Sequence, residues 1–161
     1  MIQRIQTVYL SLAFIAIALL FTFPLAHFFS ENDIKGAYIF SVTGLRNEVP
    51  GGPDAFKPMI FLPLIVVTVG IALLTLYAIF QFKNRLFQVK LTNIGVLAAI
   101  GLIMGIFFLY IPMIEKKVNI IPDYRKAYGI YLALVALVFL VLANRAIKRD
   151  DKLIRSADRL R

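Results

Sequence analysis

The sequence predicts an all-α membrane protein: a bundle of four transmembrane helices with a small β-hairpin-like outer loop and a cytoplasmic amphipathic C-terminal helix. Three observations lead to this fold class. Apolar residues make up 60% of the 161 residues and charged residues only 17%, whereas about a quarter of an ordinary soluble domain is charged. The apolar residues gather in four long runs, and the charged residues lie almost entirely between them. A globule this small has too little interior for so many apolar side chains, so we expect lipid to cover most of them.

Each of the four runs is long enough to cross a membrane as a helix. At about 1.5 Å per residue, they reach across a hydrocarbon layer roughly 30 Å thick. Backbone amides in lipid must be hydrogen-bonded within the segment, which favours helices, and no run has a charged residue in its interior. The first run is longer than the apolar part of a signal peptide and lacks a small-x-small exit, so we expect it to be retained. The predicted helices, within one membrane domain of residues 1–161, are 5–28, 59–80, 91–111 and 127–143.

The basic residues predict the orientation of these helices. The N-terminal flank, the loop after the second run and the C-terminal tail together carry more Lys and Arg than the other two loops. Those two loops hold most of the acidic residues. Because basic flanks stay in the cytoplasm during insertion, both termini are predicted to be cytoplasmic.

The loop between the first two runs, residues 29–58, is the largest outer element. Its residues 37–44 are rich in β-branched and aromatic side chains and end at a glycine, which predicts a strand. A second strand is predicted around residues 45–49, and the Pro and Gly residues at 50–53 predict a turn back to the membrane. We therefore expect a small hairpin on the outer face.

The C-terminal tail, residues 144–161, is predicted to be an amphipathic helix because it lacks Pro and Gly and its apolar residues recur at helical spacing. Three interpretations are open: a solvated extension whose cations fix the topology, a helix lying on anionic headgroups, or a docking element for an acidic protein or RNA. Topology combined with lipid contact accounts for the charge most simply, and no nucleic-acid partner is expected. The residues predicted to contact the membrane surface or a partner are Arg145, Lys148, Arg149, Lys152, Arg155 and Arg159.

Two residue pairs are candidates for helix packing. Gly101 and Gly105 form a small-xxx-small pair, which lets two helix backbones approach closely in lipid. We favour packing within the bundle over self-association for this pair. Thr68 and Thr75 lie one heptad apart on one face of the second run, and we interpret them as helix–helix contacts whose hydroxyls bond their own preceding turns.

The sequence has few residues that could form a catalytic, metal or cofactor site. It contains no cysteine and a single histidine, which excludes thiolate chemistry and a zinc centre built from several histidines. We therefore expect no catalytic residues, no metal and no cofactor. His27 lies at the outer end of the first run, where it is either an interfacial polar residue, which we favour, or a metal ligand, quinone contact or pH sensor. With Glu115 and Asp123 it forms the only plausible polar cluster for a membrane enzyme.

Both ends of the chain resemble a known family. The opening Met1-Ile2-Gln3-Arg4-Ile5-Gln6-Thr7 and the closing segment, which runs from Leu142-Ala143-Asn144-Arg145 to Arg155-Ser156-Ala157-Asp158-Arg159-Leu160-Arg161, resemble a bacterial family of small four-helix membrane proteins catalogued only as a domain of unknown function. The resemblance covers the whole length. It implies a location in the inner membrane of a Gram-negative bacterium, and it supplies no activity or ligand.

From the residues themselves we expect a non-catalytic integral membrane protein that serves as a small subunit or scaffold of a membrane complex. Its partners would be the lipid bilayer and either another membrane protein or a second copy of the chain. The alternative is a small-solute transporter or channel that acts as an oligomer. A membrane enzyme comes third, because the only polar cluster is widely separated in the sequence.

Overall fold

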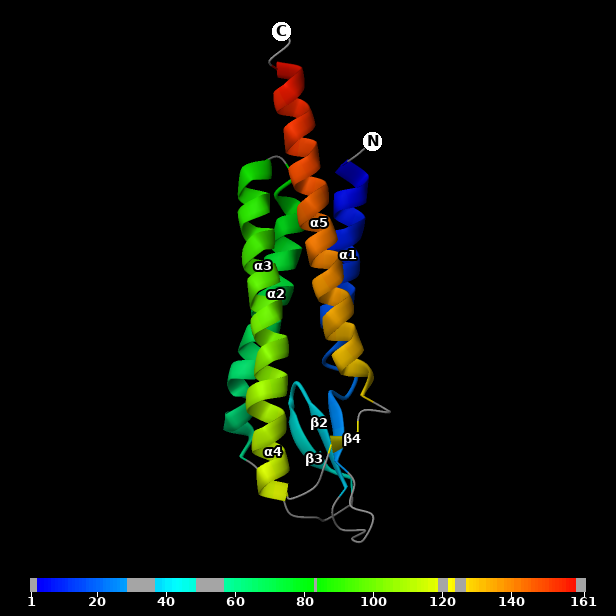
Figure 1. Ribbon diagram of the computed structural model, residues 1–161, viewed down its shortest axis with the longest axis vertical. Helices are drawn as coiled ribbons and strands as arrows, with labels where there is room; N and C mark the ends of the chain where they lie inside the picture. Colours follow the sequence, from blue (N-terminus) through cyan, green and yellow to red (C-terminus); the bar gives the residue numbers. More distant parts are fainter. Residues whose placement is uncertain are drawn as a thin grey trace.

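The computed structural model describes residues 3–28, 37–48, 57–82, 84–118, 122–123 and 127–158. Long helices lie side by side in a bundle, and a small sheet caps one end of it (Figure 1). Both chain termini lie at the opposite end. We call the two ends of the bundle the sheet end and the terminal end.

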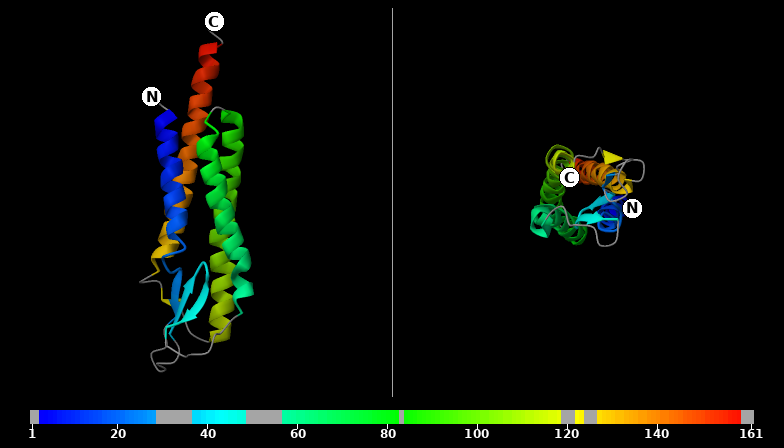
Figure 2. Two further views of the ribbon diagram at one scale, coloured as in Figure 1. Left: turned by 180° about the vertical axis from the view of Figure 1, so that it is seen from behind. Right: turned by 90° about the horizontal axis from the view of Figure 1, so that it is seen from below.

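The described residues form four helical rods, and the view along the bundle in Figure 2 shows them arranged around a common axis. Their neighbours in space follow the order α1, α2, α3, α5 and back to α1, and the most extensive contact joins α1 to α5. The third rod is α3, which continues through the π-helical turn η2 into α4. The elements are α1 (Gln3–Leu19), η1 (Pro58–Phe61), α2 (Leu62–Phe80), α3 (Arg85–Gly105), η2 (Ile106–Tyr110), α4 (Ile111–Val118) and α5 (Tyr128–Asp158).

Three of the rods are long and apolar enough to cross a membrane. These segments are Met59–Phe80, Arg85–Lys117 and Tyr128–Leu153. Length and composition therefore confirm the character of a membrane protein. The apolar part of α1, Ile5–Leu19, is shorter, and all 17 residues of α1 measure about 26 Å at 1.5 Å per residue.

The prediction of one continuous helix over residues 5–28 is wrong at its C-terminal third. Helix α1 ends at Leu19, and a turn leads to strand β1 (Ala26–Phe28). Pro24 explains the break, because its ring has no N–H to donate and disfavours helical geometry in the preceding residue. The next amide, that of Leu25, donates to the carbonyl oxygen of Phe40 at 2.7 Å. The end of the first apolar run therefore belongs to the sheet.

The sheet contains the predicted hairpin and two further strands. Strands β2 (Tyr38–Ser41) and β3 (Gly44–Asn47) pair antiparallel, with Ser41 opposite Gly44. The φ angle of Gly44 is 148°, a conformation that residues with a Cβ atom rarely adopt. Strand β1 adds beside β2 and the short β4 (Pro122–Asp123) beside β1, giving the order β3-β2-β1-β4. The rest of the predicted outer loop, residues 29–36 and 49–56, lies outside the described residues.

Three other helix boundaries differ from the predictions. The third rod continues through α4 to Val118 rather than ending at residue 111. The third helix begins at Arg85 rather than at residue 91, because the Oδ1 atom of Asn84 accepts a hydrogen bond from the amide of Phe87 at 3.3 Å and caps the first turn. The fourth run and the C-terminal tail form one helix, α5, rather than two. No Gly or Pro follows residue 129, so nothing in the sequence interrupts it.

An aromatic cluster joins the sheet to the bundle. The rings of Phe40 in β2, Phe61 in η1 and Tyr110 in η2 lie with centroids 5.8 to 6.1 Å apart. The hydroxyl of Tyr110 also donates to the carbonyl oxygen of Ile60 at 3.2 Å. Because each ring comes from a different element, the cluster fixes the sheet against α2 and the third rod.

Candidate functional site

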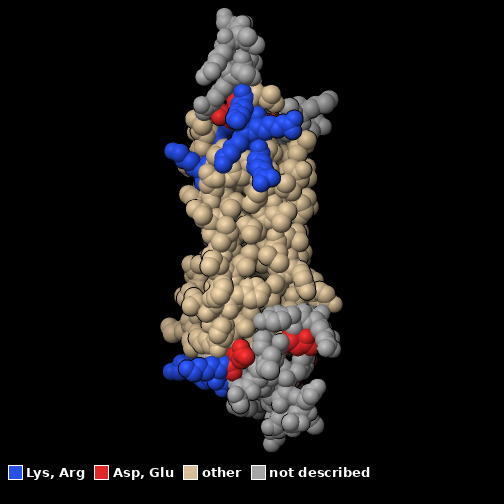
Figure 3. All heavy atoms as spheres, viewed as in Figure 1, with Lys and Arg blue, Asp and Glu red and all other residues tan. Residues whose placement is uncertain are grey.

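Charge is distributed along the bundle in three zones. On the face drawn in Figure 3, Lys and Arg gather at the terminal end, an uncharged belt covers the middle, and charged residues reappear at the sheet end. Large apolar side chains are exposed on the belt, including Val66, Leu97 and Phe108. A continuous apolar belt between two charged ends matches the hydrocarbon layer and the two interfaces of a bilayer.

A buried polar link joins α1 to α5 at the terminal end. The Nε2 atom of Gln6 donates to the Oδ2 atom of Asp150, and both side chains are 4% exposed. The other carboxylate oxygen of Asp150 is also buried, with no hydrogen-bond partner among the described residues. The sequence reasoning missed this link, because every interpretation of the charged tail placed it outside the packed bundle.

Further polar side chains lie in the same half of the bundle. The Nδ2 atom of Asn144 in α5 donates to the Oδ1 atom of Asn93 in α3. The Nε2 atom of Gln88 in α3 donates to the carbonyl oxygen of Ala78 near the end of α2, at 2.9 Å. These bonds connect neighbouring rods in a medium that offers no water, where an unpaired polar group is costly.

The threonines predicted to take part in helix packing are both buried. Thr68 is 0% and Thr75 2% exposed. Their hydroxyls donate to the carbonyl oxygens of Leu64 and Ile71, four residues earlier, at 2.8 and 2.7 Å. The side chains therefore enter the bundle with their polar atoms bonded to their own helix, and their methyl groups are left for packing.

The glycines of α3 occupy two different environments. A Cβ atom on Gly95 would lie 3.8 Å from the side chain of Leu140 in α5, whereas one on Gly101 or Gly105 would meet nothing within 4 Å. Gly101 and Gly105 instead line a groove of about 410 Å³ between α2 and the third rod. Leu64 and Val67 form its opposite wall, and we call it the α2–α3 groove.

Within the bundle, close approach depends on other small residues. Buried alanines occur on both helices of the most extensive contact, at Ala13 and Ala16 of α1 and at Ala133 and Ala136 of α5. Gly129, at the start of α5, donates its amide to the carbonyl oxygen of Pro24 at 2.8 Å. The sequence reasoning singled out none of these five positions, although the spacing of the alanines was a usable signal.

The predicted cationic surface of α5 is exposed as far as the structure describes it. Arg145, Lys148, Arg149 and Lys152 are all exposed at the terminal end. The side chain of Arg155 and the whole of Arg159 lie outside the described residues. Helix α5 continues past the ends of the other rods without a break (Figure 1). Contact of these cations with lipid or a partner stays a prediction.

His27 lies in the sheet rather than in a helix. It is 8% exposed in β1 and stands directly opposite Asp123 of β4 in the antiparallel ladder. The fold thus brings together two members of the polar cluster that the sequence suggested, while Glu115 is exposed on α4. Across the described part of the chain, no three His, Cys, Asp or Glu residues gather where they could hold a metal ion.

Comparison with known proteins gives a family but no activity. A family model with the description "Domain of unknown function (DUF4293)" matches residues 2–160. No curated protein matches the chain at a significant level. The predicted resemblance of the chain to a family of unknown function is thereby confirmed.

Proposed function

The chain belongs to the DUF4293 family, and we propose that it is a non-catalytic integral membrane protein that packs against another membrane protein or a second copy of itself. In this proposal it is a small subunit or scaffold of a complex in the bacterial inner membrane. The chain crosses the bilayer four times and keeps both termini in the cytoplasm. The three zones of charge, the arrangement of the rods and the α2–α3 groove support the proposal.

The position of α1 beside α5 supports the proposal of four crossings. The two helices share the most extensive contact in the bundle, and Tyr9 of α1 stacks on Phe139 of α5 with ring centroids 6.4 Å apart. A helix packed against a membrane-spanning neighbour lies at the same depth. The buried residues Leu20 and Leu25 continue the apolar segment toward the sheet. The basic terminal end then faces the cytoplasm.

The α2–α3 groove is the observation that carries the role as a subunit. Close packing through small residues is a main source of helix association in lipid, where the hydrophobic effect contributes nothing between helices. Gly95 and the buried alanines of α1 and α5 lie at such contacts inside the bundle, whereas Gly101 and Gly105 face open space. A helix from another protein or from a second copy could pack closely against this groove, because the two glycines have no side chains to keep it away.

Transport by a single copy has less support. The polar side chains that bond one rod to another lie in the terminal half of the bundle, whereas Leu64, Leu102 and Ile106 are buried toward the sheet end, where Thr68 bonds only to its own helix. A polar solute crossing the bundle axis would have to pass this apolar layer. A pore would therefore require several copies of the chain. Transport by such an oligomer remains the alternative function.

Substitutions at two glycines test the proposal. We expect Gly101→Leu to fill the α2–α3 groove and to abolish association, while Gly70→Leu, whose new side chain also enters open space but outside the groove, leaves association intact. Each variant is purified in mild detergent after crosslinking in the membrane, and its mass and its crosslinked peptides are determined by mass spectrometry. Recovery of the wild-type chain as a lone monomer, or equal association of both variants, would contradict the proposal.

A further inference from the structure

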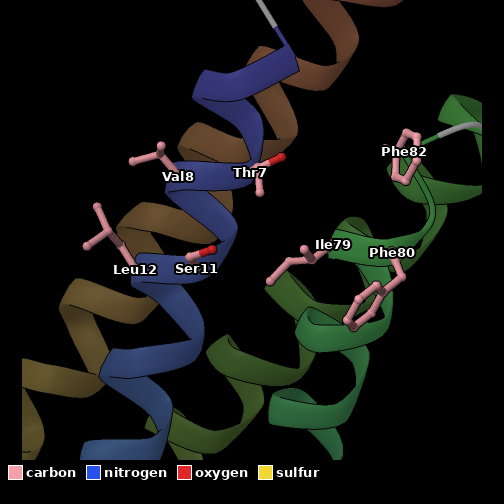
Figure 4. A pocket seen from close by; sticks show the side chains of 7 residues that line it. All are labelled: Thr7, Val8, Ser11, Leu12, Ile79, Phe80 and Phe82. Carbon is pink, nitrogen blue, oxygen red and sulfur yellow. The ribbon is translucent and has the colours of Figure 1, made fainter.

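A second groove opens between α1 and α2 at the terminal end. Figure 4 shows α1 and α2 well separated there, with Thr7 and Ser11 of α1 and Ile79 of α2 directed toward the space between them. Val8 and Leu12 contribute to one wall, and Ile79 and Phe80 to the other. The groove has a volume of about 610 Å³, which lies within the range of roughly 300–1,000 Å³ typical of small-molecule sites.

The lining of this α1–α2 groove is polar near the terminal end and apolar toward the middle of the bundle. Its side chains are apolar apart from the hydroxyl groups of Thr7 and Ser11, which lie one turn apart on α1 (Figure 4). Both hydroxyls are near the terminal end of the helix, while Leu12 continues the wall toward the apolar belt. A ligand that fits must therefore carry polar atoms at the interface and a hydrocarbon portion below them.

The cationic side chains at the terminal end favour a ligand whose polar portion is negatively charged. Arg85 follows the α2–α3 connection and is half-buried, and its Nη1 atom is buried with no hydrogen-bond partner among the described residues. An arginine guanidinium matches the geometry of a phosphate group. Among the acidic side chains described at this end, the carboxylate of Asp150 already accepts a hydrogen bond from Gln6. The described cations here are Arg85, Lys90, Arg145, Lys148, Arg149 and Lys152.

We propose that the α1–α2 groove binds one anionic glycerophospholipid of the leaflet that surrounds the terminal end. An acyl chain lies against Val8, Leu12 and Phe80, and the hydroxyl of Ser11 donates to an ester or phosphate oxygen. Arg85, which follows Phe82 of the groove lining by three residues, balances the phosphate charge. The site requires membrane insertion but not the partner at the α2–α3 groove, so the two proposals can fail separately.

Native mass spectrometry of the full chain, stripped of lipid and then supplied with defined lipids, tests the site. The probes are dioleoyl phosphatidylglycerol, dioleoyl phosphatidylethanolamine and inorganic phosphate. We expect the wild-type chain to retain one phosphatidylglycerol. Arg85→Gln should lower its affinity relative to phosphatidylethanolamine about tenfold, since a charge-assisted hydrogen bond is lost.

Two further variants separate the groove from the rest of the surface. Ser11→Phe should abolish retention of either lipid because its ring fills the space, whereas Val66→Phe, on an exposed part of α2, should not. Equal retention of the two lipids by the wild-type chain would overturn the proposal. So would undiminished binding by Ser11→Phe, binding of phosphate alone, or loss of binding only when Arg145, Lys148 and Arg149 are replaced by Gln.

Discussion

The contact between Gly129 and the turn after α1 yields a sharp prediction. A Cβ atom at Gly129 would lie 2.7 Å from the carbonyl oxygen of Pro24 and 2.9 Å from that of Phe23. Both are backbone atoms, which cannot rotate away as a side chain can. The Gly129→Ala substitution therefore has to push α5 away from the turn, and this displacement weakens the 2.8 Å bond from the Gly129 amide to Pro24.

The magnitude follows from two terms and a matched control. Overpacking of this kind costs about 1–3 kcal/mol, and a weakened backbone hydrogen bond adds about 1 kcal/mol. Gly70→Ala serves as the control, because a Cβ atom there meets nothing within 4 Å and alanine gains about 0.8–1 kcal/mol over glycine in a helix interior. The two variants should therefore differ by about 2 kcal/mol or more.

Thermal unfolding in detergent provides the measurement. Far-ultraviolet circular dichroism follows the helices directly, which suits a chain without tryptophan. With about 2–4 °C per kcal/mol for a chain of this size, Gly129→Ala should melt about 4–8 °C below Gly70→Ala. If Gly129→Ala melts at the same temperature as the control or above it, the close contact between α5 and the turn does not exist as described.

Three further predictions concern other parts of the bundle. Asp150→Ala should cost about 1–3 kcal/mol because it leaves the buried Gln6 amide unpaired, and a double-mutant cycle with Gln6→Ala should show coupling of about 1 kcal/mol or more in thermal unfolding; additive effects would refute the link. Phe61→Ala should cost about 3–5 kcal/mol since Phe61 is 1% exposed, whereas Phe82→Ala, at 51% exposed, should change the melting temperature little; equal losses would contradict the role of the aromatic cluster. The chain has no cysteine, so Thr43→Cys and Lys148→Cys give single-label variants, and a membrane-impermeant maleimide should label the first in intact spheroplasts and the second only after lysis. The reverse pattern would invert the proposed orientation.

The helices could be predicted because hydropathy reports directly on the solvent of a segment. The second span was placed at residues 59–80, as in the structure. The first was extended too far because a hydropathy pattern does not record where backbone hydrogen bonds go. The amide of Leu25 bonds to Phe40 and that of Gly129 to Pro24, and both partners are distant in the sequence. Strands β1 and β4 arise from such pairings, which cannot be predicted from short apolar segments.

The packing residues show a similar limit. The spacing of Gly101 and Gly105 predicts a face where helices can approach, but spacing cannot tell which neighbour lies there. That depends on how α2 is positioned, and the result is an open groove for Gly101 and a contact with Leu140 for Gly95. No packing role was predicted for Asp150, whose sequence neighbours are charged. It is buried because Gln6, at the start of α1, lies beside it.

The continuity of α5 restricts how its cations can act. From Asn144 to Asp158 the helix extends for about 21 Å without a break, and Figure 1 shows it passing the ends of the other rods in line with its membrane-facing part. A helix that leaves the bundle in this direction cannot also lie flat on the headgroups. Asp150 still contacts α1, so in the proposed orientation we expect Arg145 and Lys148, which precede it, at the depth of the lipid phosphate groups. Lys152 follows Asp150 on the same helix, and we expect it further from the bilayer, where an acidic protein surface is the more accessible partner.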